Sequence, residues 1–167
     1  MPSAAYAVRG VALFLKNLLF TVLVPGTVAV LVPWRLASAS LASRAPTLTD
    51  WLPAAPAFLC GASVYFWCLW DFGRTGRGTP APIDPPKTLV VRGLYRYVRN
   101  PMYVGVLLVI AGWAILVRTR DIAIYGASVA SAFHLFVVFV EEPMLRRQFG
   151  ASYDAYCQQV SRWWPTF

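Results

Sequence analysis

Residues 101–142, PMYVGVLLVIAGWAILVRTRDIAIYGASVASAFHLFVVFVEE, form two apolar segments separated only by the polar sequence RTRD. The first segment, 101–117, is short for a membrane span, whereas the second, 121–142, is long enough to cross a bilayer. Because so few residues join them, we expect two membrane helices in a tight antiparallel hairpin. Small residues in both segments would let these two helices approach closely: Gly105, Ala111, Gly112, Gly126 and Ala130.

Two further apolar segments precede this hairpin, at 8–33 and 53–72. The first resembles a signal peptide, but it is long, it is interrupted by Lys16 and Asn17, and no clear cleavage site follows. We expect it to be a membrane helix with a kink at Pro25. The chain is 58% hydrophobic and only 13% charged, which is typical of an integral membrane protein.

These features predict an all-α, polytopic membrane protein with about four transmembrane helices. We expect one domain, 1–167, in which 1–72 supply two N-terminal membrane helices and 73–167 form a ligand-binding core. The residues after Gly150, a predicted C-cap, would form a short amphipathic helix at the membrane interface. The three cysteines have no metal-type spacing, and neither a metal site nor a catalytic triad is expected.

The formal net charge of +8 could indicate nucleic acid, but the basic residues lie between apolar segments, which points to anionic lipid headgroups instead. The loop 73–100 carries six Lys or Arg residues and one Asp, so the positive-inside rule places it in the cytoplasm. Counting spans then puts both termini on the cytoplasmic side and the loop 34–52 outside. We expect a protein of a bacterial inner membrane.

The start of the segment at 101 has the pattern of a helix N-terminus. Asn100 is a favoured N-cap residue and Pro101 occupies the favoured first position. The Asn100 side chain is expected to accept from the N–H of Met102 or Tyr103. Such a terminus attracts anions, and Arg99 lies beside it. The alternative is that the arginines here only anchor headgroups.

The last apolar segment ends in Glu141 and Glu142, the only glutamates of the chain. Burying two carboxylates at a membrane edge is costly unless they are paired or bind a cationic group. One interpretation is an ion pair with Arg146 or Arg147 one turn later. The other is a binding site for a zwitterionic ligand. His134, seven residues before Glu141, is expected on roughly the same helix face, although a lone histidine is more often structural.

The loop sequence GRTGRG, residues 73–78, invites a dinucleotide-binding interpretation. That fingerprint needs a strand before it and a helix after it, but here an expected membrane helix precedes and prolines follow. We therefore disfavour it.

Three stretches together resemble the isoprenylcysteine carboxyl methyltransferase and phospholipid methyltransferase family of integral membrane enzymes. They are LVVRGLYRYVRNPMYVG at 89–105, EEPMLRRQFGASYDAY at 141–156 and the closing SRWWP at 161–165. The resemblance covers about residues 73–165. The family hallmark Arg-His-Pro-x-Tyr-x-Gly corresponds to 99–105, with Asn100 in place of the histidine, which removes a titratable side chain.

The resemblance implies S-adenosylmethionine as the cofactor and a hydrophobic or lipid acceptor whose carboxylate, thiol or amine is methylated. Transferred by matching motif, the expected cofactor-binding residues are Lys87, Thr88, Leu89, Val90, Tyr95, Asn100, Pro101, Met102, Tyr103, Glu141 and Glu142. Glu142 and Arg99 are the expected catalytic residues, and His134 is a candidate for contact with the acceptor. The family resemblance also suggests that the C-terminal segment closes over the cofactor.

This cofactor suits the residues. Its carboxylate suits the helix N-terminus and Arg99, its ammonium or ribose hydroxyls suit a glutamate, and its sulfonium suits the aromatic faces of Tyr95 or Tyr103. Methyl transfer can proceed largely by positioning. An amine acceptor would need a base, for which Glu142 or His134 are candidates. A lipidic acceptor would enter between the third and fourth helices.

Two alternatives remain from the sequence. One is a membrane reductase that uses a nicotinamide cofactor, since sterol reductases have a related helical core. The other is a non-catalytic membrane protein of the same fold, which the change at Asn100 keeps open.

Overall fold

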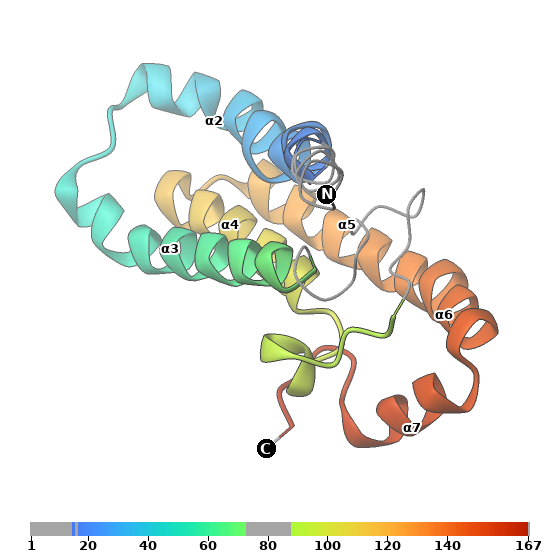
Figure 1. Cartoon of the computed structure of the whole chain (residues 1–167). Helices are drawn as coiled ribbons and strands as arrows, with labels where there is room; N and C mark the ends of the chain where they lie inside the picture. The colour runs from blue at the N-terminus through green and yellow to red at the C-terminus, as the bar shows by residue number, and fades with distance from the viewer. Residues whose placement is uncertain (1–14, 16, 73–87, 167) are drawn as a thin grey trace, which may run out of the picture.

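The computed structural model describes residues 15, 17–72 and 88–166, which form helices joined by short connections (Figure 1). These residues contain no strand, only an isolated parallel bridge between Val98 and Ser161. The all-α polytopic prediction is therefore confirmed. Three helices are long and apolar enough to cross a membrane, and a fourth apolar helix is shorter: Asn17–Ser43, Leu48–Asp71, Arg120–Phe149 and Pro101–Val117.

The third helix, α4 (Pro101–Val117), has the predicted bounds. The second, α3 (Leu48–Asp71), begins at Leu48 and not at 53, because Thr47 and Asp50 form a capping box that starts it. The first helix continues to Ser43 instead of ending at 33, through a segment of good helix formers without glycine. The fourth helix also continues beyond its expected end at 142, as far as Phe149.

The first helix contains a π-helical turn, η1 (Thr27–Leu31), followed by α2 (Val32–Ser43). The N–H of Val32 donates to the carbonyl of Thr27, five residues back. Pro33 follows at once and has no N–H to donate, so the regular four-residue spacing is interrupted at this point. A single turn residue also interrupts the helix at Val24, directly before Pro25, where the sequence predicts an irregularity.

The fourth helix is built in the same way. α5 (Arg120–Phe136) continues into a π-helical turn, η4 (Val137–Glu141), and then into α6 (Glu142–Phe149). The N–H of Glu142 donates to the carbonyl of Val137, and Pro143 follows. The two glutamates therefore lie at the junction of a π turn and an α-helix, and not at the end of a regular helix.

Glycines hold α3 and α4 close together. A Cβ added to Gly61 would lie 2.7 Å from the Gly105 carbonyl oxygen, and one added to Gly112 would lie 2.9 Å from the Phe58 ring. The expectation that Gly105 and Gly112 would serve the hairpin of the third and fourth helices is wrong, because they face the second helix. Of the three glycines named for this hairpin, Gly126 does face across it, against Ile110. The hairpin itself turns within two residues.

Side chains from the helices meet in a core cluster, with partly buried neighbours around it: Ala29, Ala37, Tyr65, Val106, Ile110 and Ile122. At one end of this bundle, Asp50 is the centre of a group of polar contacts. Its buried carboxylate accepts from the Thr47 N–H at 2.9 Å and from Arg44 at 2.8 Å, and Arg118 lies at 4.0 Å.

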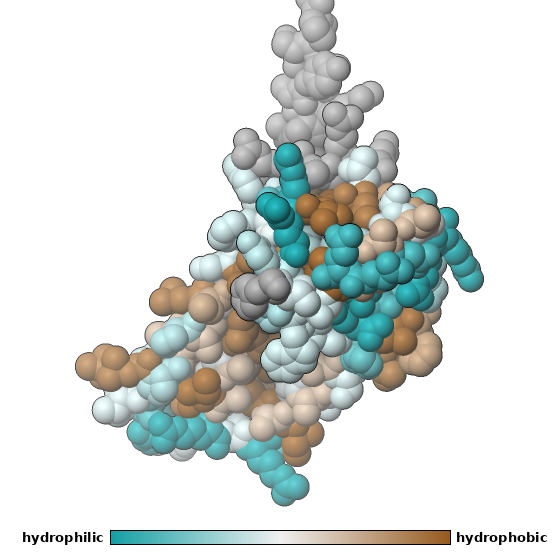
Figure 2. Space-filling view, turned by 90° about the horizontal axis from the view of Figure 1, so that it is seen from below, coloured by the Kyte–Doolittle hydropathy of each residue, from teal (hydrophilic) through white to brown (hydrophobic). Residues whose placement is uncertain are grey.

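The opposite end of the bundle, which we call the Glu142 end, brings together the end of α3, the start of α4 and α6 (Figure 1). It also carries a 3-10 turn, η3 (Gly93–Arg96), and α7 (Ala151–Gln159). Gly150, with φ +53°, ends α6 as predicted, in a conformation that favours glycine. Seen from this side, hydrophilic side chains gather over α6 and α7 (Figure 2).

Candidate functional site

A cavity of about 540 Å³ lies at the Glu142 end, a volume within the range of small-molecule sites. Polar and aromatic side chains line one part of it: Tyr95, Arg99, Asn100, Tyr103, Glu141, Glu142, Tyr153 and Tyr156. The rest of the lining is apolar, and it comes from the first helix, the end of α3, the segment before η3 and the fourth helix: Phe20, Val24, Phe72, Leu89, Val90, Ala132, Phe133, Phe136, Val137, Val140, Met144 and Leu145.

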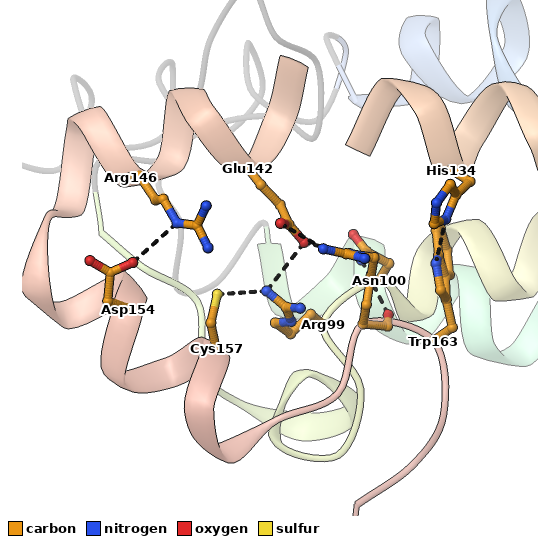
Figure 3. A network of polar contacts seen from close by, with 9 residues as sticks. Arg99, Asn100, His134, Glu142, Arg146, Asp154, Cys157 and Trp163 are labelled. Carbon is orange, nitrogen blue, oxygen red and sulfur yellow. Dashed lines mark hydrogen bonds and ion pairs between the residues drawn. The ribbon is translucent and has the colours of Figure 1, made fainter. Parts of the chain in front are cut away.

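Glu142 is the centre of the polar part, and its side chain is only 5% exposed. Arg162 holds it with two hydrogen bonds, from Nε to Oε1 at 2.6 Å and from Nη2 to Oε2 at 2.9 Å. Arg99 adds an ion pair from Nη1 to Oε1 at 3.2 Å (Figure 3). Bidentate, charge-assisted bonds of this kind are among the strongest in proteins. The carboxylate also raises the pKa of Arg162, which therefore stays charged.

Arg99, Arg162 and Glu142, which we call the cationic cluster, carry more positive than negative charge. Two guanidiniums face the single carboxylate of Glu142, which leaves one net positive charge. Arg99 also contacts the Cys157 thiol, yet its Nε is buried and has no hydrogen-bond partner among the described residues. A buried donor without a partner costs about 1–3 kcal/mol, so a ligand oxygen that reached it would be favoured. The cluster is suited to an anionic group.

Glu141 has a different partner from its neighbour. Its Oε2 accepts a hydrogen bond from the Tyr103 hydroxyl at 2.8 Å, and no cation among the described residues lies within ion-pair distance of it. The two carboxylates diverge because adjacent helical residues point about 100° apart. Glu142 therefore belongs to the cationic cluster, whereas Glu141 faces the cavity beside a neutral phenol.

Asn100 occupies the N-cap position of α4 but does not cap it. Its side chain makes no capping hydrogen bond, and its Nδ2 donates instead to the Arg162 carbonyl at 3.2 Å. Its backbone, with φ −123° and ψ 51°, is outside the extended region usual for an N-cap. The expected bond to the N–H of Met102 or Tyr103 is therefore wrong, because the C-terminal segment competes for this side chain.

That segment, residues 160–166, is called the tail here, and it lies along the loop before α4. The Arg99 N–H donates to the Ser161 carbonyl at 2.9 Å, and the Thr166 N–H donates to the Tyr97 carbonyl at 2.9 Å. Trp163 Nε1 donates to His134 Nδ1 at 3.1 Å (Figure 3). The tail thus connects the loop, the fourth helix and Glu142, and Arg162 is its one side chain in the cationic cluster.

Most of the residues expected from the sequence lie at the cavity: Leu89, Val90, Tyr95, Arg99, Asn100, Tyr103, Glu141 and Glu142. Thr88, Pro101 and Met102 are not among its lining residues, and Lys87 lies outside the described residues, as does the GRTGRG stretch.

His134 is exposed, bonded to Trp163, and absent from the lining. The π turn between it and Glu141 changes the rotation per residue, so spacing by regular helical turns misplaces it.

The alternative in which Arg146 or Arg147 pairs with the glutamates is not what the structure shows. Arg146 forms its ion pair with Asp154, at 3.1 Å on the surface, and not with Glu142 (Figure 3). The residue that does pair with Glu142 is Arg162, in the SRWWP motif, where nothing in the local sequence indicates this role. Phe20, Val24, Tyr153 and Tyr156 were also missed, and only the three-dimensional packing brings them to the cavity.

The tyrosines of the site are neutral. Burial raises the pKa of Tyr95 well above its usual value, and it raises the pKa of Tyr153 and Tyr156 as well. The Tyr156 hydroxyl donates to the Tyr95 carbonyl at 2.6 Å, which fixes the loop against α7. The described residues contain no group of His, Cys, Asp and Glu that could hold a metal ion.

The geometry can be set beside known proteins. The model of a family described as phospholipid methyltransferase matches residues 51–152, which include most of the cavity lining but neither the first helix nor the tail. No curated protein and no solved structure matches the chain.

Proposed function

The chain belongs to the phospholipid methyltransferase family, and on this premise we propose that it transfers a methyl group from S-adenosylmethionine to a hydrophobic or lipid acceptor. The reaction would take place at the Glu142 end, in the cavity between the first helix, the start of α4 and the end of the fourth helix. The observation that carries the proposal is the combination, in one cavity, of a cationic cluster with an apolar part inside a membrane protein.

The residues present fit this cofactor. Arg99 and Arg162 supply one positive charge in excess of Glu142, and Arg99 Nε is a buried donor with no partner in the described part of the chain; both features suit an amino-acid carboxylate. Glu141 lines the cavity and has no cationic partner among the described residues, which suits an ammonium group or ribose hydroxyls. The aromatic rings of Tyr95 and Tyr103 suit a sulfonium. When bound, the cofactor supplies an electrophilic methyl group.

The protein's own contribution would be positioning and the exclusion of water. Arg162 and Arg99 fix the Glu142 carboxylate, and Tyr103 fixes that of Glu141. A carboxylate or thiolate acceptor needs no base at neutral pH, whereas an amine acceptor must lose a proton. Glu141 is the better placed of the acidic residues for that task, because Glu142 is already neutralised by two arginines and His134 does not line the cavity.

A nicotinamide cofactor fits less well. It would bring a pyrophosphate group, and Arg99 is the only cationic side chain among the described residues that line the cavity. Pyrophosphate sites usually offer a glycine-rich helix N-terminus or several cations. The described part of the cavity offers neither.

The proposal extends to the orientation of the protein in the membrane. The start of α4, the end of α3 and the tail all lie at the Glu142 end, together with residues 88–100, the described part of the basic loop before α4. We propose that this end faces the cytoplasm, as the positive-inside rule requires, in a bacterial inner membrane.

The test uses the purified protein in nanodiscs. Titration calorimetry with S-adenosylhomocysteine should show one site per chain, and NADPH should give no heat. Incubation with methyl-labelled S-adenosylmethionine and a lipid extract of the source cell should transfer label to an extractable product. Arg162→Ala should lower binding, whereas Arg146→Ala, an arginine in an exposed ion pair on α6, should not. Absence of both binding and transfer in the parent would overturn the proposal.

A further inference from the structure

The two adjacent tryptophans of the tail, Trp163 and Trp164, have different surroundings. Trp164 is 80% exposed and makes no hydrogen bond or ring contact with the described residues, which is typical of an aromatic side chain at a membrane interface. Trp163 is half-buried and contacts aromatic rings of two helices. Anchoring in the membrane interface therefore explains Trp164, whereas Trp163 needs another explanation.

Trp163 packs against Tyr103, the tyrosine that binds Glu141. The centroids of the Trp163 and Tyr103 rings are 6.4 Å apart and their planes are inclined by 66°, an edge-to-face arrangement that is favourable for aromatic pairs. Phe133 contacts the same tyrosine, with ring centroids 4.7 Å apart. Rings from the tail and from α5 therefore restrict the rotation of the Tyr103 side chain, whose hydroxyl donates to Glu141 Oε2 at 2.8 Å.

His134 holds Trp163 in turn. Trp163 Nε1 donates to His134 Nδ1 at 3.1 Å, and the two ring centroids are 6.2 Å apart (Figure 3). An indole N–H can only donate, so this bond requires that His134 Nδ1 carries no proton. His134 is exposed on a membrane-spanning helix, where ionisable side chains are rare and usually have a function. Orienting Trp163 is a function that does not require His134 to line the cavity.

The tail therefore reaches both glutamates. Arg162 binds Glu142 directly, through two hydrogen bonds. The next residue, Trp163, reaches Glu141 through Tyr103. Two carbonyl groups of the tail also accept hydrogen bonds from the loop before α4, which fixes the tail backbone at this point.

We propose that Trp163 is a positioning residue for the proposed methyl transfer: held by His134, it fixes Tyr103 and thereby the direction of the Glu141 carboxylate in the cavity. This rests on the proposed function and gives the tail a second task besides the cationic cluster. Trp163 does not line the cavity, so it acts through Tyr103. His134 is a positioning residue as well, and not a base for the acceptor.

The direction of Glu141 matters because a misplacement of about 1 Å at a reacting centre can lower a rate by about two orders of magnitude. A phenol hydroxyl bound to a carboxylate is a charge-assisted contact, so a Tyr103 ring held in place also holds Glu141. The alternative is that Trp163 only anchors the tail. In that case its loss would also loosen Arg162, and cofactor affinity and turnover would fall together.

The first experiment separates these two roles. In nanodiscs, Trp163→Ala should lower kcat for methylation of the lipid extract by at least about tenfold. Its affinity for S-adenosylhomocysteine should stay within about threefold of the parent, because the contacts of Arg162 remain. Trp164→Ala removes the same side chain from the next position and is the matched control, which should leave both quantities within about twofold. Equal losses of affinity and kcat in Trp163→Ala would overturn the inference.

The second experiment tests whether Trp163 acts through Tyr103. Tyr103→Phe keeps the ring but loses the hydroxyl that binds Glu141. Adding Trp163→Ala to this variant should change kcat by no more than about twofold, because no hydroxyl is left to position. If the two substitutions instead lowered kcat by the product of their separate effects, Trp163 would act independently of Tyr103 and the inference would be wrong.

The third experiment tests the acceptor atom on His134. Asn at this position can offer an oxygen close to the place of Nδ1, whereas Leu offers no acceptor. His134→Asn should therefore keep kcat within about twofold of the parent, and His134→Leu should lower it by at least about threefold, as expected for one lost hydrogen bond. If Asn were as damaging as Leu, the role assigned to His134 would be wrong.

The failures are distinguishable. If the parent transfers no methyl group, the proposed function fails, and the positioning role, which is defined for that reaction, fails with it. If the parent transfers methyl and Trp163→Ala behaves like Trp164→Ala, the proposed function stands and the positioning role of Trp163 is wrong.

Discussion

Arg162 donates both hydrogen bonds of its guanidinium fork to the Glu142 carboxylate, although the two residues are twenty positions apart in the chain. This contact fastens the tail to the junction between η4 and α6. The Arg162 carbonyl simultaneously accepts from Asn100 Nδ2, so one residue of the tail connects the fourth helix to the start of α4. The candidate site is therefore completed by the last few residues of the chain.

Arg162→Ala should destabilise the protein and weaken cofactor binding. Removing one partner of a buried pair typically costs about 3–5 kcal/mol, and because Arg99 remains as a second partner we expect about 1–3 kcal/mol. Arg146→Ala is the control, since it breaks an exposed pair worth about 0–1 kcal/mol. Thermal unfolding in detergent and S-adenosylhomocysteine titration measure the two effects. If both variants lost similar amounts of thermal stability and cofactor affinity, the Glu142–Arg162 contact would contribute no more than an exposed ion pair.

The two glutamates should respond differently to neutralisation. Glu142→Gln removes the carboxylate that holds the Arg99 and Arg162 guanidiniums in position, so affinity for S-adenosylhomocysteine should fall by at least about tenfold, or ~1.4 kcal/mol. Glu141→Gln keeps an oxygen that can accept from Tyr103 or a ribose hydroxyl but loses the charge that suits an ammonium group, so cofactor affinity should fall by less than in Glu142→Gln. If Glu141 serves the acceptor, its substitution should lower kcat instead. Titration and steady-state kinetics of both variants decide this, and equal small effects would argue that neither carboxylate contacts a ligand.

Substitutions at Asn100 test whether its side chain caps α4 or bonds to the tail. Asn100→Ala should lose about 0.5–1.5 kcal/mol, the usual worth of one hydrogen bond. Asn100→Ser keeps an oxygen that can cap a helix but is too short to replace the amide at the Arg162 carbonyl. We therefore expect Ser and Ala to be equally destabilised in thermal unfolding. If Ser matched the parent, capping would be the function of this side chain after all.

Restoring the family histidine tests the same position. In Asn100→His, cofactor binding should depend little on pH between about 6 and 8, although an ordinary histidine titrates near 6.5. The reason is that the position holds the tail and is not an acid–base centre. A clear pH dependence in calorimetric titrations would contradict this.

Local sequence signals predicted the helices and several of their ends. Pro101 and Gly150 marked boundaries because proline fits a first helical turn and glycine tolerates a positive φ. The π turns had a signal as well, since each ends two residues before a proline, Pro33 or Pro143. That signal was used only for Pro25. The capping box at Thr47 was also present in the sequence but not used.

Partner choice could not be predicted, because it depends on packing between distant segments. Nothing local shows that Glu142 would select Arg162 over Arg146 or Arg147, which lie one turn away. Asn100 was assigned to its own helix, yet its partner lies sixty-two residues later. The cavity residues Phe20 and Val24 belong to a helix with no transferable motif, so only the fold brings them to the site.

The glycines of the α3–α4 contact give the sharpest test of the fold. Gly61→Ala would place a Cβ 2.7 Å from the Gly105 carbonyl oxygen and 2.8 Å from the Val109 amide nitrogen. Both are backbone atoms, so the clash can be relieved only by moving the helices apart, and small residues are what allow such close contact in membranes.

Gly126→Ala is the matched control, since its Cβ would meet only the Ile110 side chain, at 3.2 Å. Both substitutions gain about 1 kcal/mol of helix propensity, so this contribution cancels in the comparison. Gly126→Ala should therefore leave the melting temperature in detergent unchanged or raise it, whereas Gly61→Ala should lower it and weaken S-adenosylhomocysteine binding, because α4 carries Tyr103 into the site. If Gly61→Ala were as stable as Gly126→Ala, α3 and α4 could not lie as close as described, and the position of the start of α4 in the site would have to be revised.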